Sequence, residues 1–236
     1  MATKTTWLIT GTSRGIGLEF VRQLATSAEN VVIASCRNPD AATDLKAIVS
    51  KAKGTMHVVP LDVGDLESIK GVEKYVKDII GDEALDYLLN NAGTHPGEAD
   101  AFNISPETFI TAMNTNVLGP AKLAETLLPY LERSQRPVVM NMSSGLGSFG
   151  FDLGPICAAY SVSKTALNMI TYKQAKAKPN VIFFAVDPGW VKTEMGGEGA
   201  QLEPDVSVSG ILKLLKSISL QQSGQYFRHD GSTSPW

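Results

Sequence analysis

Cysteine and histidine are scarce in this sequence, which argues against two kinds of site. Cys36 and Cys157 are the only cysteines among 236 residues, so neither a disulfide framework nor an oxidising compartment is indicated. The three histidines, His57, His95 and His229, are far apart, and none stands at metal-ligand spacing from a cysteine or another histidine. We therefore expect no metal site, and a cytoplasmic location fits the composition best.

Excess positive charge and long hydrophobic runs are also lacking. The chain has 21 Lys and Arg against 24 Asp and Glu, a formal net charge of -3, and no basic stripe, so nucleic acid is not an expected partner. No stretch approaches the roughly 18 uninterrupted apolar residues of a membrane span, and the first residues lead into a strand pattern without a signal-peptide layout. We expect no association with a membrane.

Short apolar runs rich in β-branched residues alternate with longer amphipathic segments. The short runs are typical of buried strands, and they cover 5–10, 30–36, 56–61, 85–90, 137–142 and 181–186. Apolar residues at helical spacing occur in 17–28, 39–52, 65–80, 105–133 and 160–177. Pro39 and Pro106 follow Asn38 and Ser105, which predicts an N-cap with proline at the first helical position.

This alternation predicts an α/β protein with a single domain that spans 1–236. Strand and helix repeats of this kind form a doubly wound parallel sheet of the Rossmann type, with helices on both faces. No linker, repeat or low-complexity segment divides the chain. Ligands in such sheets bind beyond the carboxyl ends of the strands, so a functional motif should directly follow a strand.

The run "TGTSRGIG", from Thr10 to Gly17, follows the first predicted strand and opens the first predicted helix. Glycines at 11, 15 and 17 let a pyrophosphate approach the backbone, and the helix N-terminus offers free N–H groups. The spacing G-x-x-x-G-x-G is a variant of the common dinucleotide fingerprint. A glycine-rich turn without a ligand is the alternative, but the place of this run in the first strand and helix unit favours nucleotide binding.

The end of the second predicted strand bears on the choice of nucleotide. NAD-binding folds place an acidic residue there to hold the ribose hydroxyls, whereas a nearby arginine accommodates a 2′-phosphate. Here the strand ends "ASCRNPD", with Arg37 in that region and Arg14 inside the glycine loop. Two guanidinium groups near one phosphate favour NADPH over NADH, although Asp40 is close in sequence, and Arg37 in a solvated loop is the alternative.

Tyr160 and Lys164 stand one helical turn apart in "YSVSK". Positions i and i+4 share a helix face, so the phenol and the ammonium group can converge on one point. Such a pair also arises by chance, and a half-buried tyrosine with a satisfied hydroxyl is the alternative.

Seven motifs together resemble the short-chain dehydrogenase/reductase family. They occur in the family's order over essentially the whole chain: "TGTSRGIG", "LDV", "NNAG", "NTNVLG", "VVMNMSS", "YSVSK" and "DPGWVKTEM". The runs "PGWVKTEMGG", "VSVSGILKLLKSISLQQSGQYF" and "DGSTSPW" are similar to sniffer-type carbonyl reductases and C-factor-like proteins, a branch that also resembles fungal norsolorinic-acid-type ketoreductases. Asp187 departs from the histidine that is common at this position in that branch.

The resemblance implies four catalytic residues. Tyr160 would protonate the substrate carbonyl. Lys164 and the positive nicotinamide of the oxidised cofactor would both lower the pKa of the phenol, and Lys164 would also hold the nicotinamide ribose. Ser144, the second serine of "NMSSGLG", would hydrogen-bond the carbonyl, with Ser143 as its neighbour. Asn116 would distort its helix and hold a water of the proton relay; Asn114 competes for this role but fits the motif less well.

The resemblance also assigns the cofactor site. Asp62 would meet the adenine, Asn90 and the residues after it would line the cofactor, and Thr193 would hold the carboxamide. The complete predicted set is Gly11, Thr12, Ser13, Arg14, Gly15, Ile16, Gly17, Arg37, Asp62, Val63, Asn91, Ala92, Gly93, Tyr160, Lys164, Pro188, Gly189, Val191 and Thr193.

The predicted function is NADPH-dependent reduction of a neutral, bulky or aromatic ketone, aldehyde or quinone. The substrate pocket is expected between 94–103, 145–157 and 190–202, with Phe149, Phe151, Ile156 and Trp190 as its apolar wall. The alternative is a non-enzymatic NADP(H)-binding regulator of the same fold, which would have no need of the four catalytic residues. A homo-oligomer, either dimer or tetramer, is left open.

Overall fold

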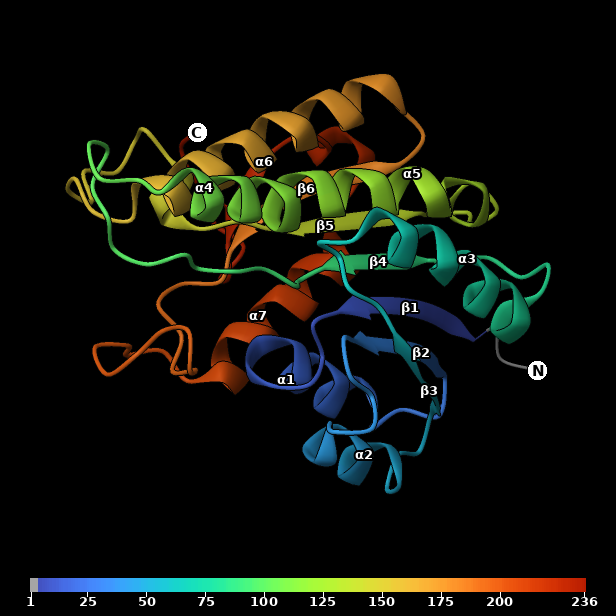
Figure 1. The fold of residues 1–236 in the computed structure, drawn as a ribbon. Helices are drawn as coiled ribbons and strands as arrows, with labels where there is room; N and C mark the ends of the chain where they lie inside the picture. The colour runs from blue at the N-terminus through green and yellow to red at the C-terminus, as the bar shows by residue number, and fades with distance from the viewer. Residues whose placement is uncertain (1–3) are drawn as a thin grey trace.

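The computed structural model describes residues 4–236, which form one seven-stranded sheet covered by helices on both faces (Figure 1). The strands are β1 (Thr5–Thr10), β2 (Asn30–Cys36), β3 (Thr55–Pro60), β4 (Tyr87–Asn90), β5 (Val138–Met142), β6 (Ile182–Asp187) and β7 (Tyr226–Arg228). The helices are α1 (Gly15–Leu24), α2 (Thr43–Val49), α3 (Leu66–Ile80), α4 (Pro106–Met113), α5 (Gly119–Leu131), α6 (Ala158–Ala177) and α7 (Pro204–Ser217). Shorter elements are a π-helix at Asn114–Leu118 and 3₁₀ turns at Gly145–Gly147 and Leu220–Gln222.

The strand order is β3-β2-β1-β4-β5-β6-β7, and all neighbours pair in parallel. The chain therefore adds β2 and β3 on one side of β1 and then adds β4 to β7 on the other side. The change of direction lies between β1 and β4. This arrangement confirms the predicted fold class. Binding sites in such sheets lie at this change of direction.

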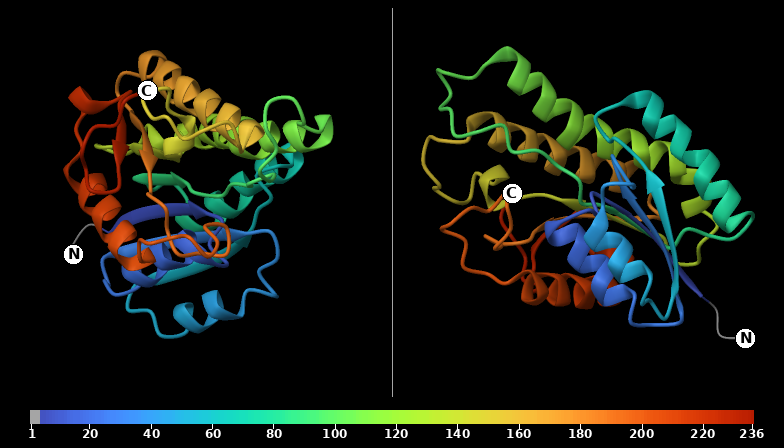
Figure 2. Two further views of the ribbon diagram at one scale, coloured as in Figure 1. Left: turned by 90° about the vertical axis from the view of Figure 1, so that its left-hand side faces the viewer. Right: turned by 60° about the horizontal axis from the view of Figure 1, so that its bottom comes forward.

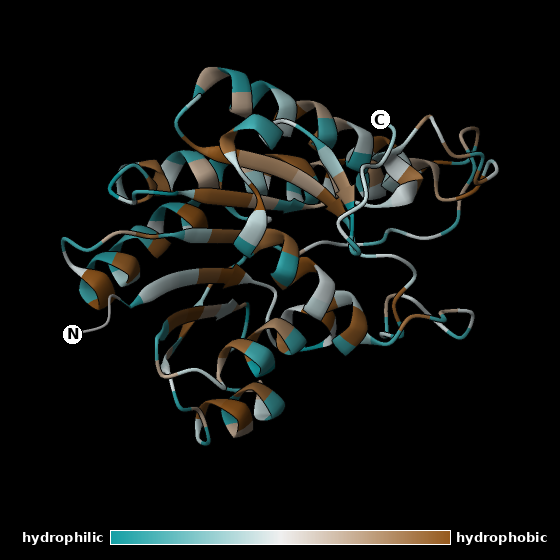
Figure 3. Ribbon diagram, turned by 180° about the vertical axis from the view of Figure 1, so that it is seen from behind, coloured by the Kyte–Doolittle hydropathy of each residue, from teal (hydrophilic) through white to brown (hydrophobic). Residues whose placement is uncertain are grey.

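Both faces of the sheet are buried because successive side chains of each strand point to opposite sides. One row across the sheet, Ile9, Leu89, Met140 and Phe184, packs against α1 and α7. The adjacent row, Leu8, Leu88, Val139 and Phe183, packs against α3, α5 and α6. Figure 2 shows the sheet between these two groups of helices. In Figure 3, which is coloured by hydropathy, the brown of hydrophobic residues covers much of the central strands. Each such side chain contributes roughly 1.5–3 kcal/mol by burial.

Of the two helix starts that were predicted at prolines, one is confirmed and one is wrong. Pro106 does stand at the start of α4, where the Ser105 hydroxyl accepts from the Thr108 N–H at 3.3 Å, so that prediction is confirmed. The predicted start at Pro39 is wrong, because α2 begins only at Thr43. The Asn38 side chain accepts from the Ala41 N–H at 3.3 Å, a local turn that competes with helix formation.

The predicted helix over 105–133 is divided in three. α4 and α5 are joined by the π-helix at Asn114–Leu118, which contains Asn116. π-Helical turns insert one residue into a helix and are frequent at functional sites.

α7 and β7 lie after the last predicted strand and were not predicted. Within residues 4–236, no helix combines the length and apolarity needed to cross a membrane.

Candidate active site

The glycine loop joins β1 to α1 with almost no space between the loop and its neighbours. Gly11 has φ +70°, a left-handed conformation that favours glycine. A Cβ on Gly17 would overlap the main-chain oxygen of Gly11 and lie 2.6 Å from the Asn91 amide nitrogen. No side chain caps the start of α1 at Arg14, so the backbone N–H groups there are open to a ligand.

Hydrogen bonds join the ends of β1 and β4 next to this loop. The Thr10 hydroxyl oxygen accepts from the Asn91 and Ala92 N–H groups at 3.0 and 2.9 Å. The Asn91 side-chain nitrogen donates to the main-chain oxygen of Thr10 at 2.8 Å. The segment after β4 is thus held against the glycine loop, at the change of direction in the sheet.

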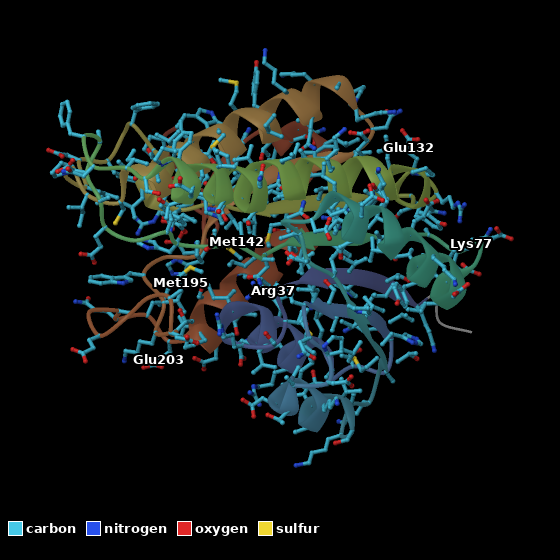
Figure 4. All side chains as sticks on the ribbon, in the orientation of Figure 1. Arg37, Lys77, Glu132, Met142, Met195 and Glu203 are labelled. Carbon is cyan, nitrogen blue, oxygen red and sulfur yellow. The ribbon has the colours of Figure 1, made fainter. Side chains whose placement is uncertain are left out.

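A cleft of about 660 Å³ runs along the carboxyl edge of the sheet from this loop to α6. Figure 4 shows Arg37, Met142 and Met195 at this edge, whereas Lys77 and Glu132 lie at the opposite end of the molecule. Most of the residues predicted to hold the cofactor line the cleft: Gly11, Ser13, Arg14, Gly15, Ile16, Gly17, Arg37, Asp62, Val63, Asn91, Ala92, Gly93, Tyr160, Lys164, Pro188 and Thr193.

Three predicted cofactor residues lie behind the cleft lining instead. Thr12 is fully buried and donates its hydroxyl to the Ser35 oxygen at 3.0 Å. Val191 is buried, and Gly189, with φ +78°, forms the turn that follows β6. Their positions suit residues that shape the backbone of the site.

Two arginines near the glycine loop and the end of β2 line the cleft. Arg37 lines it directly, and Asp40 faces away, pairing with Lys46 at 3.5 Å. Arg14 extends from the glycine loop and pairs with Glu194 at 3.1 Å. Arg14 and Arg37 are thus both cationic groups of the cleft, and β2 ends at Cys36 without a carboxylate.

Tyr160 and Lys164 lie at the other end of the cleft, on one face of α6. The Lys164 Nζ atom lies 5.4 Å from the centre of the Tyr160 ring and donates to the Met142 oxygen at 2.7 Å. A Cβ on Gly147 would lie 2.7 Å from the Lys164 Cβ, so the 3₁₀ turn packs directly on α6. That contact brings the preceding Ser144 to Tyr160.

Burial controls the ionisation of this pair. It raises the pKa of Tyr160 to about 12, with the Ser144 hydroxyl acting in the opposite direction and the Asp187 carboxylate raising the pKa further. Burial lowers the pKa of Lys164 to about 8. The pKa of Tyr160 is therefore raised on balance, because the cost of burying a phenolate outweighs the effects that lower the pKa.

Asn116 joins three segments from its position in the π-helix. It is fully buried, and its side-chain oxygen accepts from the Thr94 N–H at 2.8 Å. Its side-chain nitrogen donates to the Thr94 oxygen at 2.9 Å and to the Ser163 hydroxyl at 3.0 Å. The segment after β4 is in this way fixed to the helix that carries Tyr160.

Three polar residues at the site were missed or left without a role. Asn168 accepts from the Ser143 hydroxyl at 2.6 Å and donates to the Gly147 oxygen at 3.2 Å, spanning the turn that contains Ser144. Its spacing could have been noticed, since it stands two helical turns after Tyr160. His95 lies against the Tyr160 ring, and Asp187 ends β6 beside the site, accepting from the Gly189 N–H at 3.1 Å.

The aromatic wall predicted for the substrate pocket is arranged differently. Phe149 is 89% exposed and lies in a separate hollow over the outer face of α6, with Val162 and Met169. Trp190 folds back on its own loop, donating to the Gly196 oxygen at 2.7 Å. A Cβ on Gly145 would lie 3.7 Å from Phe151 and Leu153, so those two side chains supply apolar surface beside Ser144.

Within residues 4–236, no cluster of three or more His, Cys, Asp or Glu side chains is arranged to hold a metal ion.

Comparison with known proteins agrees with this fold. The family model for short chain dehydrogenases matches residues 5–203, and the chain belongs to this family. The chain is similar in structure to the NADPH-bound carbonyl reductase from chicken fatty liver, with 31% identity and a TM-score of 0.93 over 99% of this chain and all of that one. It is also similar to the carbonyl reductase Sniffer of Drosophila melanogaster, with 28% identity and a TM-score of 0.92 over 99% and 100% of the two chains.

Among curated sequences, an uncharacterized oxidoreductase of Schizosaccharomyces pombe is 29% identical over 250 residues, covering 98% of this chain and 97% of that protein. The predicted resemblance to short-chain dehydrogenase/reductases and to sniffer-type carbonyl reductases is confirmed, as is membership of an oxidoreductase class.

Proposed function

We propose that this protein is an NADPH-dependent carbonyl reductase that acts on neutral, bulky or aromatic ketones, aldehydes or quinones. The observation that carries the proposal is that Tyr160 and Lys164 line the cleft, with the Ser144 hydroxyl beside Tyr160, and that Arg14 and Arg37 line the same cleft. A protein that only bound the nucleotide would have no need of a buried phenol and ammonium at this point.

The cleft fits a phosphorylated dinucleotide. A Cβ at Gly11 would lie 2.9 Å from Ala92, so the glycine loop forms a cradle that larger residues would fill. Arg14 and Arg37 can hold a 2′-phosphate, and Asp62 and Val63 can meet the adenine. Pro188, Thr193 and the segment Asn91–Gly93 can hold the nicotinamide half. NADPH, when bound, supplies the hydride.

The side chains at the other end of the cleft handle the proton. Ser144 donates a hydrogen bond to the substrate oxygen and fixes the carbonyl next to Tyr160. With a pKa of about 12, Tyr160 stays protonated at neutral pH and gives its proton to the developing alkoxide. Lys164, protonated below about pH 8, stabilises the phenolate that remains. The Asn116 side chain holds the segment after β4 against α6. Asn116 also supports the proton relay that recharges Tyr160 through Lys164.

The proposal is tested by the decay of nicotinamide absorbance with NADPH and then NADH against isatin, a quinone, an aromatic ketone and a bulky polycyclic ketone. We expect turnover that prefers NADPH and falls at least about a hundredfold in Tyr160→Phe, since a general acid contributes about that much. Tyr172→Phe, on the same helix but partly exposed, is the matched control. Binding of NADPH without consumption of any carbonyl by the wild type would overturn the proposal and favour the regulator.

A further inference from the structure

His95 has no role in the proposed chemistry, yet its imidazole lies against the phenol of Tyr160. The centres of the two rings are 4.7 Å apart, and their planes meet at 41°. His95 belongs to the long loop between β4 and α4, which extends beyond the carboxyl edge of the sheet (Figure 1). The residue is half-buried.

The position of this imidazole is fixed from both sides. The preceding residue, Thr94, has its N–H and its carbonyl oxygen bound to the Asn116 side chain at 2.8 and 2.9 Å. Two residues further on, the Gly97 N–H donates to the His95 Nδ1 atom at 3.3 Å. The loop therefore presents His95 to Tyr160 in a defined orientation.

The bond from Gly97 determines which ring nitrogen carries the proton. A nitrogen that accepts a hydrogen bond has a free lone pair, so in the neutral imidazole the proton resides on Nε2. Within the part of the chain that the structure describes, 4–236, no side chain or backbone oxygen accepts from this Nε2–H. A donor is thus available beside the phenol that handles the reacting oxygen.

We propose that His95 is a specificity-determining residue whose Nε2–H donates a hydrogen bond to a second oxygen of the substrate, next to the carbonyl that is reduced. Ser144 and Tyr160 already serve the reacting oxygen, so a third donor beside the Tyr160 ring matches a neighbouring acceptor. Vicinal dicarbonyl compounds have that pattern. A site built to hydrogen-bond a substrate group discriminates against analogues that lack it. The inference rests on the proposed carbonyl reductase function.

The test compares kcat/KM with NADPH for acenaphthenequinone, a vicinal dicarbonyl, and 4-nitrobenzaldehyde, which has one carbonyl. Each is measured in the wild type, in His95→Phe, which keeps an aromatic ring against Tyr160 but has no donor, and in His95→Gln, which keeps a donor. The intrinsic reactivity of the two compounds cancels when the ratio of their kcat/KM values is compared between variants.

We expect His95→Phe to lower the ratio of dicarbonyl to aldehyde about tenfold, which is the effect of one lost hydrogen bond, and His95→Gln to restore most of it. An equal fall for both compounds, or no change for either, would overturn the inference and leave His95 a packing role. A wild type that reduces the aldehyde and not the dicarbonyl also overturns it. A wild type that reduces neither compound overturns the carbonyl reductase proposal, and the inference with it.

Discussion

The Lys164 Nζ atom donates to the Met142 main-chain oxygen at 2.7 Å, which joins the helix of the candidate active site to the last residue of β5. Only 3% of Lys164 is exposed, and within 4–236 it forms no ion pair. Burial without a counter-charge is why its pKa falls to about 8.

Replacing Lys164 by Met is expected to change how stability depends on pH. Between about pH 8 and its unfolded pKa of 10.5, Lys164 is protonated in the unfolded state and neutral in the native state, so wild-type stability rises with pH in that window. Relative to Lys164→Met, the wild type should gain on the order of 3 kcal/mol as the pH rises from about 7.5 to about 10.5. Urea unfolding of both proteins at several pH values measures this, and a constant difference would contradict it.

Asp187→Asn is expected to favour alcohol oxidation. The Asp187 carboxylate raises the pKa of Tyr160, and the neutral amide removes that effect while its oxygen still accepts from the Gly189 N–H. A larger fraction of phenolate is then present at a given pH, so the rate of alcohol oxidation at about pH 8 should rise. The rate of NADP⁺ reduction with the product alcohol measures this. Asp152→Asn, on an exposed loop nearby, is the control, and an equal rise in both variants would refute the role of Asp187.

Asn168→Ala is expected to lower kcat and leave NADPH affinity unchanged. Asn168 holds Ser143 and Gly147 on either side of Ser144, so its loss lets the Ser144 hydroxyl move relative to Tyr160. We expect a fall of about ten- to a hundredfold in kcat, because small displacements of positioned groups have effects of that size. Steady-state kinetics and NADPH fluorescence titration separate the two quantities. Weaker NADPH binding in parallel with kcat would instead indicate general loss of structure.

Arg37→Ala is expected to change the preference between cofactors. A charged hydrogen bond to the 2′-phosphate contributes about 1.5–3 kcal/mol, so the KM for NADPH should rise about ten- to a hundredfold while that for NADH stays nearly constant. Arg133→Ala, with its guanidinium stacked on Tyr130 away from the cleft, is the control. Equal effects of Arg37→Ala on NADPH and NADH would contradict a phosphate contact.

The glycine loop, most strands and the shared face of Tyr160 and Lys164 could be predicted because each depends on local pattern. Continuous apolar runs fix the strands, and helical periodicity alone places Lys164 beside Tyr160. β7 is only three residues long and has no such run, so its pairing with β6 is a tertiary effect. The late start of α2 reflects the side-chain turn at Asn38, which periodicity does not record.

The parts of the site that were not predicted depend on contacts between distant segments. His95 reaches Tyr160 across 65 residues of sequence, and its position is set by the bonds between Thr94 and Asn116. The raised pKa of Tyr160 follows from burial, which exists only after β5, β6 and α6 have packed. Phe149 and Trp190 were expected in the pocket from their loops, but loop sequence does not determine which way a side chain points.

The strand order also has a consequence for the chain as it leaves the ribosome. β1 lies between β2 and β4, so a nascent chain that ends after Asn90 can already pair four strands and form the glycine loop with Arg37 nearby. The outer edge of β4 then stays unpaired until Val138–Met142 are made, and exposed edges of this kind invite association with other chains. Half of the cleft can therefore exist before Tyr160 has been synthesised, and early nucleotide binding would stabilise that intermediate against aggregation.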